Sequence, residues 1–211
     1  MNISHPELQQ LFDTILSEST KTAITAFIDE IEQFDDQYNC EKLWIADQAI
    51  GGIGGYCMPA NPVKNPYPGG PERALYRPLQ YARSEIEICD VRLHARYAVQ
   101  MCGMHLESVC RLYLKSRKSL GPLRFGNTTL GKAIQQIQAI NEIDTNVINA
   151  LFAYVKVYNR SKHEFNQDDS RERLFNAYDA ITGYFSARVL GLNILKALNI
   201  CESFDCYETV K

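Results

Sequence analysis

The sequence predicts an all-α fold, an antiparallel helical bundle that carries an N-terminal helical extension. Apolar residues recur at intervals of three and four over most of the chain, which is the spacing of amphipathic helices. The alternation of apolar and polar residues that is typical of a half-buried strand is not evident. The later helical segments are joined by short connections, which favours antiparallel neighbours.

Two amphipathic helices are predicted at the start of the chain. In the first, residues 6–17, Pro6 suits the opening turn and the apolar side chains share one side. Ser19 or Thr20 is the predicted cap of the second helix, whose apolar repeat continues to Phe34. Both helices are therefore expected to bury one face.

A short third helical segment, residues 41–49, completes an N-terminal extension over residues 1–50. Residues 51–73, GGIGGYCMPANPVKNPYPGGPER, then hold six Gly and five Pro. So many glycines and prolines exclude a helix or a central strand, so we predict a Gly/Pro-rich loop. The GGIGG at its start follows no strand, which argues against a phosphate-binding loop.

Helical periodicity returns in residues 74–198, which we assign to the bundle itself. The segment 79–118 reads as one long helix without Pro. About 40 residues would span roughly 60 Å at 1.5 Å per residue, so a bend or a break is expected.

A loop at 119–127 is predicted after the long helix, and three further helices follow it, the last two separated by a turn at 166–170. The tail 199–211 is expected to be loosely held. Each helix has predicted capping residues: Thr128 or Thr129 for a helix to Ile140, Asp144 or Thr145 for a helix to about Phe165, and Asp169 or Ser170 for a helix to about Leu198.

Composition narrows the class of protein. Of 211 residues 45% are apolar, and the net charge is −3 with a pI near 5.8, so no global nucleic-acid footprint is present. The seven cysteines are odd in number and form no C-x-x-C, which indicates reduced thiols. The sequence lacks a signal-peptide pattern and an apolar run of about 20 residues. We expect a cytoplasmic protein that binds no membrane and no cofactor.

Polar side chains form a seam along the predicted long helix. Glu87, Asp90, His94, Met101 and His105 fall within about 60° of one another. Asp90 and His94 are four residues apart, a spacing that suits either a metal completed by another helix or a hydrogen bond that orients the imidazole. The second interpretation is favoured, and no metal ligands are assigned.

A basic cluster follows at the end of the same predicted helix: Arg111, Lys115, Arg117, Lys118 and Arg124. Cations at a helix C-terminus complement its dipole. The same cations are also suited to receiving phosphates. The sequence leaves both interpretations open.

The stretch VYNRSKHEFN carries the strongest functional pattern. Asn159 and His163 are four residues apart and share a helix face with Lys156, while Arg160 and Lys162 flank the imidazole. Neighbouring cations favour the neutral imidazole that a general base requires, and a cation stabilises charge on phosphorus during phosphodiester cleavage. The alternative is that His163 and Lys162 cap the helix C-terminus.

Two of these segments carry a family resemblance. A helix that opens with TTLGKAI (128–134), a helix that ends in YNRSKHEF (158–165) and a long closing helix resemble the HEPN-like superfamily over residues 80–198. Asn159 and His163 match the Asn and His of that family's Arg-Asn-x-x-x-His motif. Tyr158 stands at the position of the Arg, and Arg160 is displaced by about 200° around the helix.

The resemblance implies an RNA-associated homodimer of a bacterial defence or stress system. Many members are metal-independent endoribonucleases, often paired with an antitoxin, and members without the Arg bind RNA or partners without cutting. In an enzyme, His163 is the acid or base, Asn159 orients it, and Arg160 supplies charge. The substrate-binding cations would be Lys156, Lys162, Arg111, Lys115, Arg117 and Arg124. The alternative is a non-catalytic helical dimer that binds a protein partner or a small ligand, with Asn159 and His163 buried as hydrogen-bonding groups.

Overall fold

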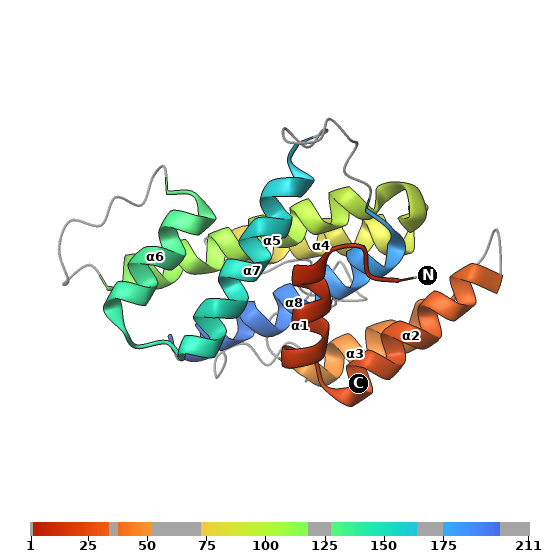
Figure 1. Cartoon of the computed structure of the whole chain (residues 1–211), viewed down its shortest axis with the longest axis horizontal. Helices are drawn as coiled ribbons and strands as arrows, with labels where there is room; N and C mark the ends of the chain where they lie inside the picture. The colour runs from red at the N-terminus through yellow and green to blue at the C-terminus, as the bar shows by residue number, and fades with distance from the viewer. Residues whose placement is uncertain (1, 34–37, 52–72, 118–127, 164–174, 199–211) are drawn as a thin grey trace, which may run out of the picture.

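The computed structural model of the chain describes residues 2–33, 38–51, 73–117, 128–163 and 175–198. These ranges form a helical bundle without strands (Figure 1), which confirms the predicted all-α class. The helices are α1 (Pro6–Ile15), α2 (Glu18–Gln33), α3 (Glu41–Ile50), α4 (Arg73–Glu87), α5 (Val91–Ser116), α6 (Leu130–Ile140), α7 (Thr145–Ser161) and α8 (Ala177–Lys196).

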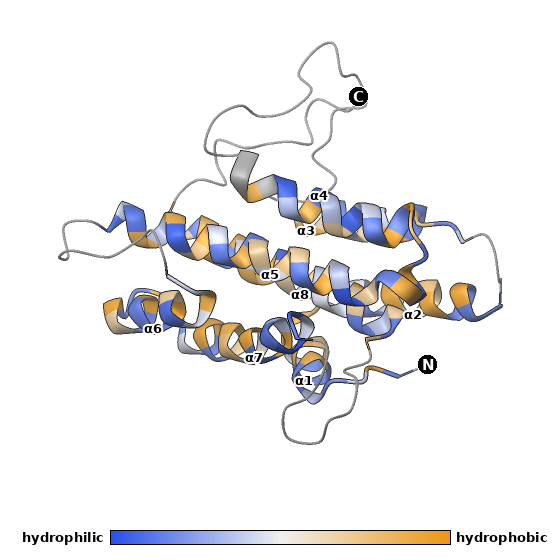
Figure 2. Cartoon of the chain, turned by 90° about the horizontal axis from the view of Figure 1, so that it is seen from above, coloured by the Kyte–Doolittle hydropathy of each residue, from blue (hydrophilic) through white to orange (hydrophobic). Residues whose placement is uncertain are grey.

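The helices are arranged in three layers, which Figure 2 shows from above. α3 and α4 form one outer layer, α6, α7 and α1 form the other, and α5, α8 and α2 lie between them. No helix in the described ranges is both long and apolar enough to cross a membrane. The described residues exclude the predicted loop at 51–73 apart from its two end residues. They also exclude the predicted loop at 119–127 and the tail 199–211.

α8 is the central helix of this arrangement. It packs against α5 and also contacts α1, α2, α3, α4 and α7. Sixteen of its twenty residues are buried. A helix with apolar residues all round is expected to be buried on every side, and α8 shows how the core depends on one such element.

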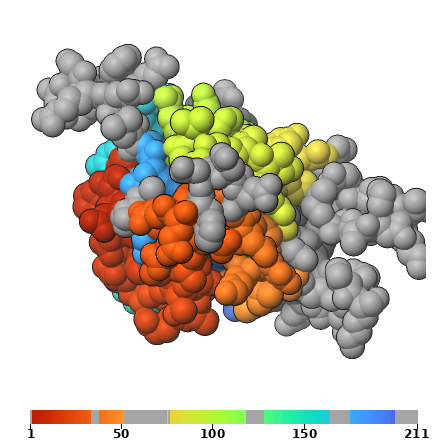
Figure 3. Space-filling model, turned by 90° about the vertical axis from the view of Figure 1, so that its right-hand side faces the viewer, coloured from red at the N-terminus to blue at the C-terminus, as the bar shows by residue number. Residues whose placement is uncertain are grey.

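The first three helices lie directly on the bundle. The Ser4 backbone N–H donates to Asp179 Oδ1 (2.8 Å), and Asn176 Nδ2 donates to Ser4 Oγ (2.7 Å), so the chain before α1 is held at the start of α8. Trp44 of α3 meets Tyr184 of α8 edge to face, with ring centroids 5.7 Å apart. In Figure 3 the orange atoms of α2 and α3 lie next to the yellow to yellow-green atoms of α4 and α5, while the red atoms of α1 lie beside the blue atoms of α8.

The predicted long helix is two helices. α4 ends at Glu87, α5 begins at Val91, and the side chain of Asp90 caps α5 by accepting a hydrogen bond from the Arg92 N–H (3.0 Å). The expected break is therefore present, and the N-cap marks it. α4 also begins earlier than predicted and contains Pro78 in its interior.

Helix ends were predicted with mixed success. Asp144 caps α7 as predicted, accepting from the Asn146 N–H at 2.7 Å. α2 begins at Glu18, before the predicted caps Ser19 and Thr20, and Ser17 Oγ accepts a hydrogen bond from the Thr20 N–H (3.2 Å). α8 begins at Ala177, well after Asp169 and Ser170, because Asn176 and Asp179 form a reciprocal capping box.

The predicted polar seam is not continuous, because the break separates Glu87 on α4 from the other four members at the start of α5 and along it. His105 is fully buried and its Nδ1 donates to the Leu75 carbonyl (2.8 Å). Asp90 does not orient His94, since the carboxylate binds Arg92 (2.8 Å) while His94 Nδ1 contacts Glu85 Oε2 at 2.6 Å.

One ion pair lies in the core. Arg188 of α8 and Asp47 of α3 are both fully buried, and Arg188 Nε donates to Asp47 Oδ1 at 2.5 Å. The same guanidinium donates to the Gly51 carbonyl (3.0 Å) just past the end of α3. Gly51 has a φ of 75°, a left-handed backbone that favours glycine. The pair therefore joins α3 and its C-terminal turn to the central helix.

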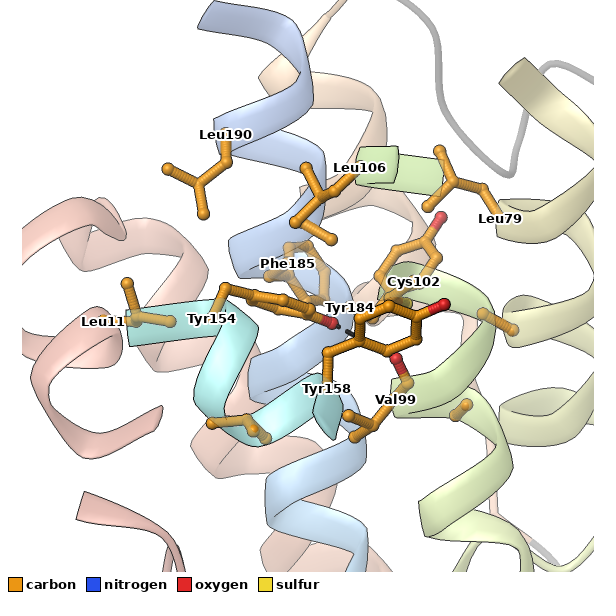
Figure 4. Packing of buried hydrophobic residues seen from close by; sticks show 14 of the residues in the cluster. Leu11, Leu79, Val99, Cys102, Leu106, Tyr154, Tyr158, Tyr184, Phe185 and Leu190 are labelled. Atoms are coloured by element: carbon orange, nitrogen blue, oxygen red, sulfur yellow. Dashed lines mark hydrogen bonds between the residues drawn. The ribbon is translucent and has the colours of Figure 1, made fainter. Parts of the chain in front are cut away.

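Aromatic side chains from α7 and α8 fill the core beside α5 (Figure 4). Tyr154 and Tyr184 are fully buried, and Tyr158 is 6% exposed. A Cβ placed on Gly103 of α5 would lie 2.1 Å from Cδ2 of Tyr158. Glycine at 103 thus leaves the space that the tyrosine ring occupies beside the α5 backbone.

Substitution of Gly103 by alanine should destabilise the fold. The added methyl group overlaps the Tyr158 ring, and we expect a loss of about 1–3 kcal/mol in the free energy of unfolding, measured by urea denaturation. Gly131→Ala is the matched control, because its Cβ would make only an ordinary contact with Val155 Cγ1 at 3.5 Å. A stable Gly103→Ala variant would contradict the close packing of α5 on α7.

Acid should destabilise the protein through His105. Burial, chiefly, lowers the pKa of its imidazole to about 4, against an ordinary value of 6.5. The unfolded state then binds the proton more readily, so stability is full above the unfolded pKa and is lost as the pH falls from 6.5 towards 4. Between pH 7 and about pH 4 the loss should be roughly 3 kcal/mol.

His105→Asn isolates this contribution, because its amide retains a donor for the Leu75 carbonyl but does not titrate. We expect urea titrations at the two pH values to show a smaller acid loss in the variant. Equal losses in variant and wild type would show that the buried imidazole is not the group responsible.

Candidate functional site at the end of α7

The exposed face of α7 is the one that the sequence predicted. Lys156 and Asn159 are exposed, whereas Tyr154 and Tyr158 point into the core. The spacing of 3.6 residues per turn places these two pairs on opposite sides of the helix. Asn159 is therefore not a buried hydrogen-bonding group, which corrects the non-catalytic alternative in that form.

His163 lies just beyond the helix rather than within it. α7 ends at Ser161, short of the predicted end near Phe165, and the His163 backbone N–H donates to the Arg160 carbonyl (3.2 Å). Its side chain is exposed and forms no ion pair with any residue that the structure describes. Lys162, also exposed, has its ammonium 4.0 Å from the centre of the Tyr158 ring.

The carbonyl at the end of α7 is bound by α5. Arg96 Nε donates to the Ser161 carbonyl at 2.6 Å, and Gln100 Nε2 donates to the same oxygen. Ser161 itself is fully buried, and its hydroxyl donates to the Tyr158 carbonyl (2.8 Å). Side chains of α5 thus cap this helix end, so the exposed His163 and Lys162 are not needed for that purpose.

Arg160 points to a different partner. Its guanidinium forms a two-pronged ion pair with Glu7 of α1, in which Nη2 lies 2.8 Å from Oε1. Burial by itself raises the pKa of the Glu7 carboxyl, but the hydrogen bond and charge of Arg160, a backbone hydrogen bond and the charge of Lys156 together lower it. The ion pair holds α1 against α7, and it occupies the cation that the sequence assigned to catalysis.

The other predicted phosphate-binding cations lie elsewhere. Arg111 pairs with Glu107 and donates to the Thr128 carbonyl (2.8 Å). Arg117 donates to Glu142 (2.8 Å), which precedes the start of α7, and this contact lowers the pKa of the Glu142 carboxyl. Lys115 is exposed on the same turn of α5. Arg124 lies outside the described residues, as does Lys118.

The two predicted basic groups are therefore at opposite ends of α7. The 17 residues of that helix span about 25 Å at 1.5 Å per residue. Four exposed polar residues lie on the last turns of α7 and just beyond its end, and we name them the α7-end cluster: Lys156, Asn159, Lys162 and His163.

The α7-end cluster contains some of the chemical groups that cleavage of a phosphodiester requires. An imidazole can take or give a proton, and two ammonium groups can stabilise charge on a phosphate. Position 158, where the resembled family carries its Arg, supplies no charge, because the tyrosine is buried against Gly103. Burial also raises the pKa of the Tyr158 hydroxyl, so it stays neutral.

An exposed apolar stripe runs along α5 beside this cluster. Leu93, Tyr97 and Met104 are 77%, 48% and 46% exposed, and their spacing of four and seven residues places them within about 40° on the helix. Since Arg96 and Gln100 of the same stretch bind the end of α7, the stripe and the cluster are neighbours. Sequence reasoning missed the stripe, because apolar residues at helical spacing were assigned to the core.

A cleft of about 540 Å³ lies between α3 and α4. The Arg83 guanidinium lies 4.2 Å from the centre of the Trp44 ring and is paired with Glu87 at 3.0 Å. The volume of the cleft is that of a small-molecule site, and the walls of the cleft are polar. Nothing in the sequence marked it, since its residues come from helices that are distant along the chain.

The resemblance to the HEPN-like superfamily depends on residues 128–134 and 158–165, and it stays a prediction. α6 begins at Leu130 inside the first of these segments, and α7 ends at Ser161 inside the second. No protein-family model, curated protein or solved structure matches the chain.

Proposed function

We propose that this chain is an RNA-associated protein that contacts RNA at the α7-end cluster and cleaves it without a metal ion, using His163. The observation that carries the proposal is the exposed His163 imidazole, which is engaged by no described carboxylate and stands at the end of the helix that exposes Lys156 and Asn159. A polyanion can approach such a group from solvent. A buried His163 side chain would have been out of reach of RNA.

The chemistry assigns one role to each side chain. The His163 imidazole takes the proton of a ribose 2′-hydroxyl, the 2′-oxygen bonds to phosphorus, and the bond to the 5′-oxygen breaks. Lys156 and Lys162 stabilise the charge that develops on the phosphate oxygens. Asn159 hydrogen-bonds the substrate or the imidazole. Arg160 has no direct part in this scheme, because Glu7 holds it.

A homodimer completes this scheme. The leaving 5′-oxygen needs a proton, and each chain offers a single imidazole at the cluster. The stripe of Leu93, Tyr97 and Met104 supports an interface next to the cluster, because exposed apolar surface of this kind is typical of protein contacts. A second copy seated on this stripe brings its own His163 towards the first.

A second candidate is a non-catalytic helical dimer that binds RNA, a protein partner or an antitoxin, or a small ligand. The observation in its favour is the pairing of the arginines, since Arg160, Arg111 and Arg117 each face a carboxylate. Unoccupied guanidinium groups would have suited phosphate better. The cleft between α3 and α4 offers a place for a small ligand in that case.

Cleavage of RNA in EDTA tests the enzyme. Wild-type protein should cut unstructured or looped RNA, and His163→Ala should slow the cut by about 100-fold or more, because the general base is lost. Asn159→Ala should reduce the rate less. Asn149→Ala, an exposed asparagine near the other end of α7, is the matched control and should leave the rate unchanged.

Binding measured by fluorescence anisotropy separates the two candidates. Lys162→Ala should weaken RNA binding, while Lys196→Ala, an exposed lysine at the end of α8, should not. Binding without cleavage supports the non-catalytic candidate. Wild-type protein that neither binds nor cuts RNA at high concentration sinks the RNA proposal.

The oligomeric state tests the stripe. Sedimentation velocity of the wild type should show a dimer, and Leu93→Asp or Met104→Asp should shift it to monomer, because a charge would be buried at the contact. Ile45→Asp provides the matched control, since Ile45 is 57% exposed on α3 and lies off the stripe. A wild-type monomer, or a dimer that survives both stripe substitutions, contradicts this interface.

A further inference from the structure

Three side chains of metal-ligating type meet where α4 passes into α5. Glu85 is on the last turn of α4, Cys89 is in the connection, and His94 is on the first turn of α5. One potential ligand atom from each residue lies within 4.8 Å of the other two. The closest pair is His94 Nδ1 and Glu85 Oε2, at 2.6 Å.

We propose that Glu85, Cys89 and His94 bind one Zn²⁺ ion per chain, with solvent in the fourth position. Tetrahedral zinc with these ligand types separates neighbouring ligand atoms by about 3.3–3.6 Å. The imidazole and the carboxylate, now 2.6 Å apart, must therefore move slightly away from each other, and the sulfur is already within 4.8 Å of both.

The donor set selects the metal. One thiolate, one imidazole and one carboxylate are the ligands of zinc, whereas magnesium and calcium prefer oxygen alone. Ionised Cys89 and Glu85 together carry two negative charges, which match those of the dication. His94 adds a neutral nitrogen. The ion thus replaces a close carboxylate–imidazole contact with a charge-balanced centre.

The connection that carries the triad is already held in place. The Tyr38 hydroxyl lies 2.9 Å from the Cys89 carbonyl and 3.1 Å from the Ile86 carbonyl, and it can donate to either. The Cys89 backbone N–H donates to the Ser84 carbonyl (3.2 Å). A ligand set on an ordered connection loses little conformational freedom when it binds the ion.

The triad is open to solvent on one side. The side chains of Glu85 and His94 are 24% and 40% exposed, so an ion can enter and keep a bound water. The neighbouring carboxylate, Asp90, is not part of the set. It caps α5 and binds Arg92 at 2.8 Å.

Zinc binding must release a proton. A cysteine binds zinc through its thiolate, so the thiol must lose its hydrogen when the ion binds. In the proposed step the zinc–sulfur bond forms, the sulfur–hydrogen bond breaks, and the proton goes to solvent. No oxidation state changes.

Cobalt substitution tests the site directly. Metal-free full-length chain is titrated with Co²⁺ and then with Zn²⁺. We expect one Co²⁺ per chain, with the intense absorption of a thiolate-to-cobalt transition, which Zn²⁺ abolishes by displacement. Cys89→Ser should remove the sulfur transition, and Cys89→Ser and His94→Ala should each weaken zinc binding by about 100-fold or more.

Glu85→Gln and Asp90→Asn form the matched pair of carboxylate variants. Asn still caps a helix, so Asp90→Asn should keep both the fold and the zinc affinity. Loss of affinity in Asp90→Asn but not in Glu85→Gln overturns the assignment. So does a cobalt spectrum without a sulfur transition in the wild type, a readout that needs no variant to fold. The site uses none of the α7-end cluster, so either proposal can fail alone.

Discussion

The buried ion pair between Arg188 and Asp47 constrains how α3 docks on α8, the central helix of the bundle. Both side chains are fully buried, and a charge left alone in the core would cost several kcal/mol. α3 can therefore dock on α8 only where the carboxylate meets the guanidinium. Because Arg188 also binds the Gly51 carbonyl, the same contact fixes where α3 ends. The position of α3 in turn shapes the cleft that it forms with α4.

The helices themselves were largely predictable, because amphipathic spacing is a local property. The exact starts of three helices were harder to predict: α2 after Ser17, α8 after Asn176 and α5 after the break before Val91. Several nearby residues can cap each helix, and tertiary packing decides among them. Asn176 is preferred because Asp179 returns a hydrogen bond and Ser4 binds both residues from the far end of the chain. Such long-range partners are invisible in a periodicity.

The α7-end cluster was predictable as a face but not as a charge distribution. Spacing alone put Lys156 and Asn159 on one side of a helix and Tyr158 on the other. It could not tell that Glu7, 153 residues away, holds Arg160. Nor could it place His94 against Glu85 instead of Asp90, since that depends on how sharply the chain turns between α4 and α5. Pairing of charges is decided by the fold.

The fit of Gly103 against Tyr158 has a consequence for recognising remote kin of this chain. Since the Tyr158 ring occupies the space where a side chain at position 103 would lie, a larger residue at 103 is favoured only with a smaller residue at 158. We expect the residues at these two positions to change together in related proteins. A side chain larger than glycine should occur at position 103 only where position 158 has a small residue, and an aromatic residue should occur at 158 only where 103 is glycine. Such a pair, 55 residues apart, would identify descendants of this bundle after overall identity has eroded.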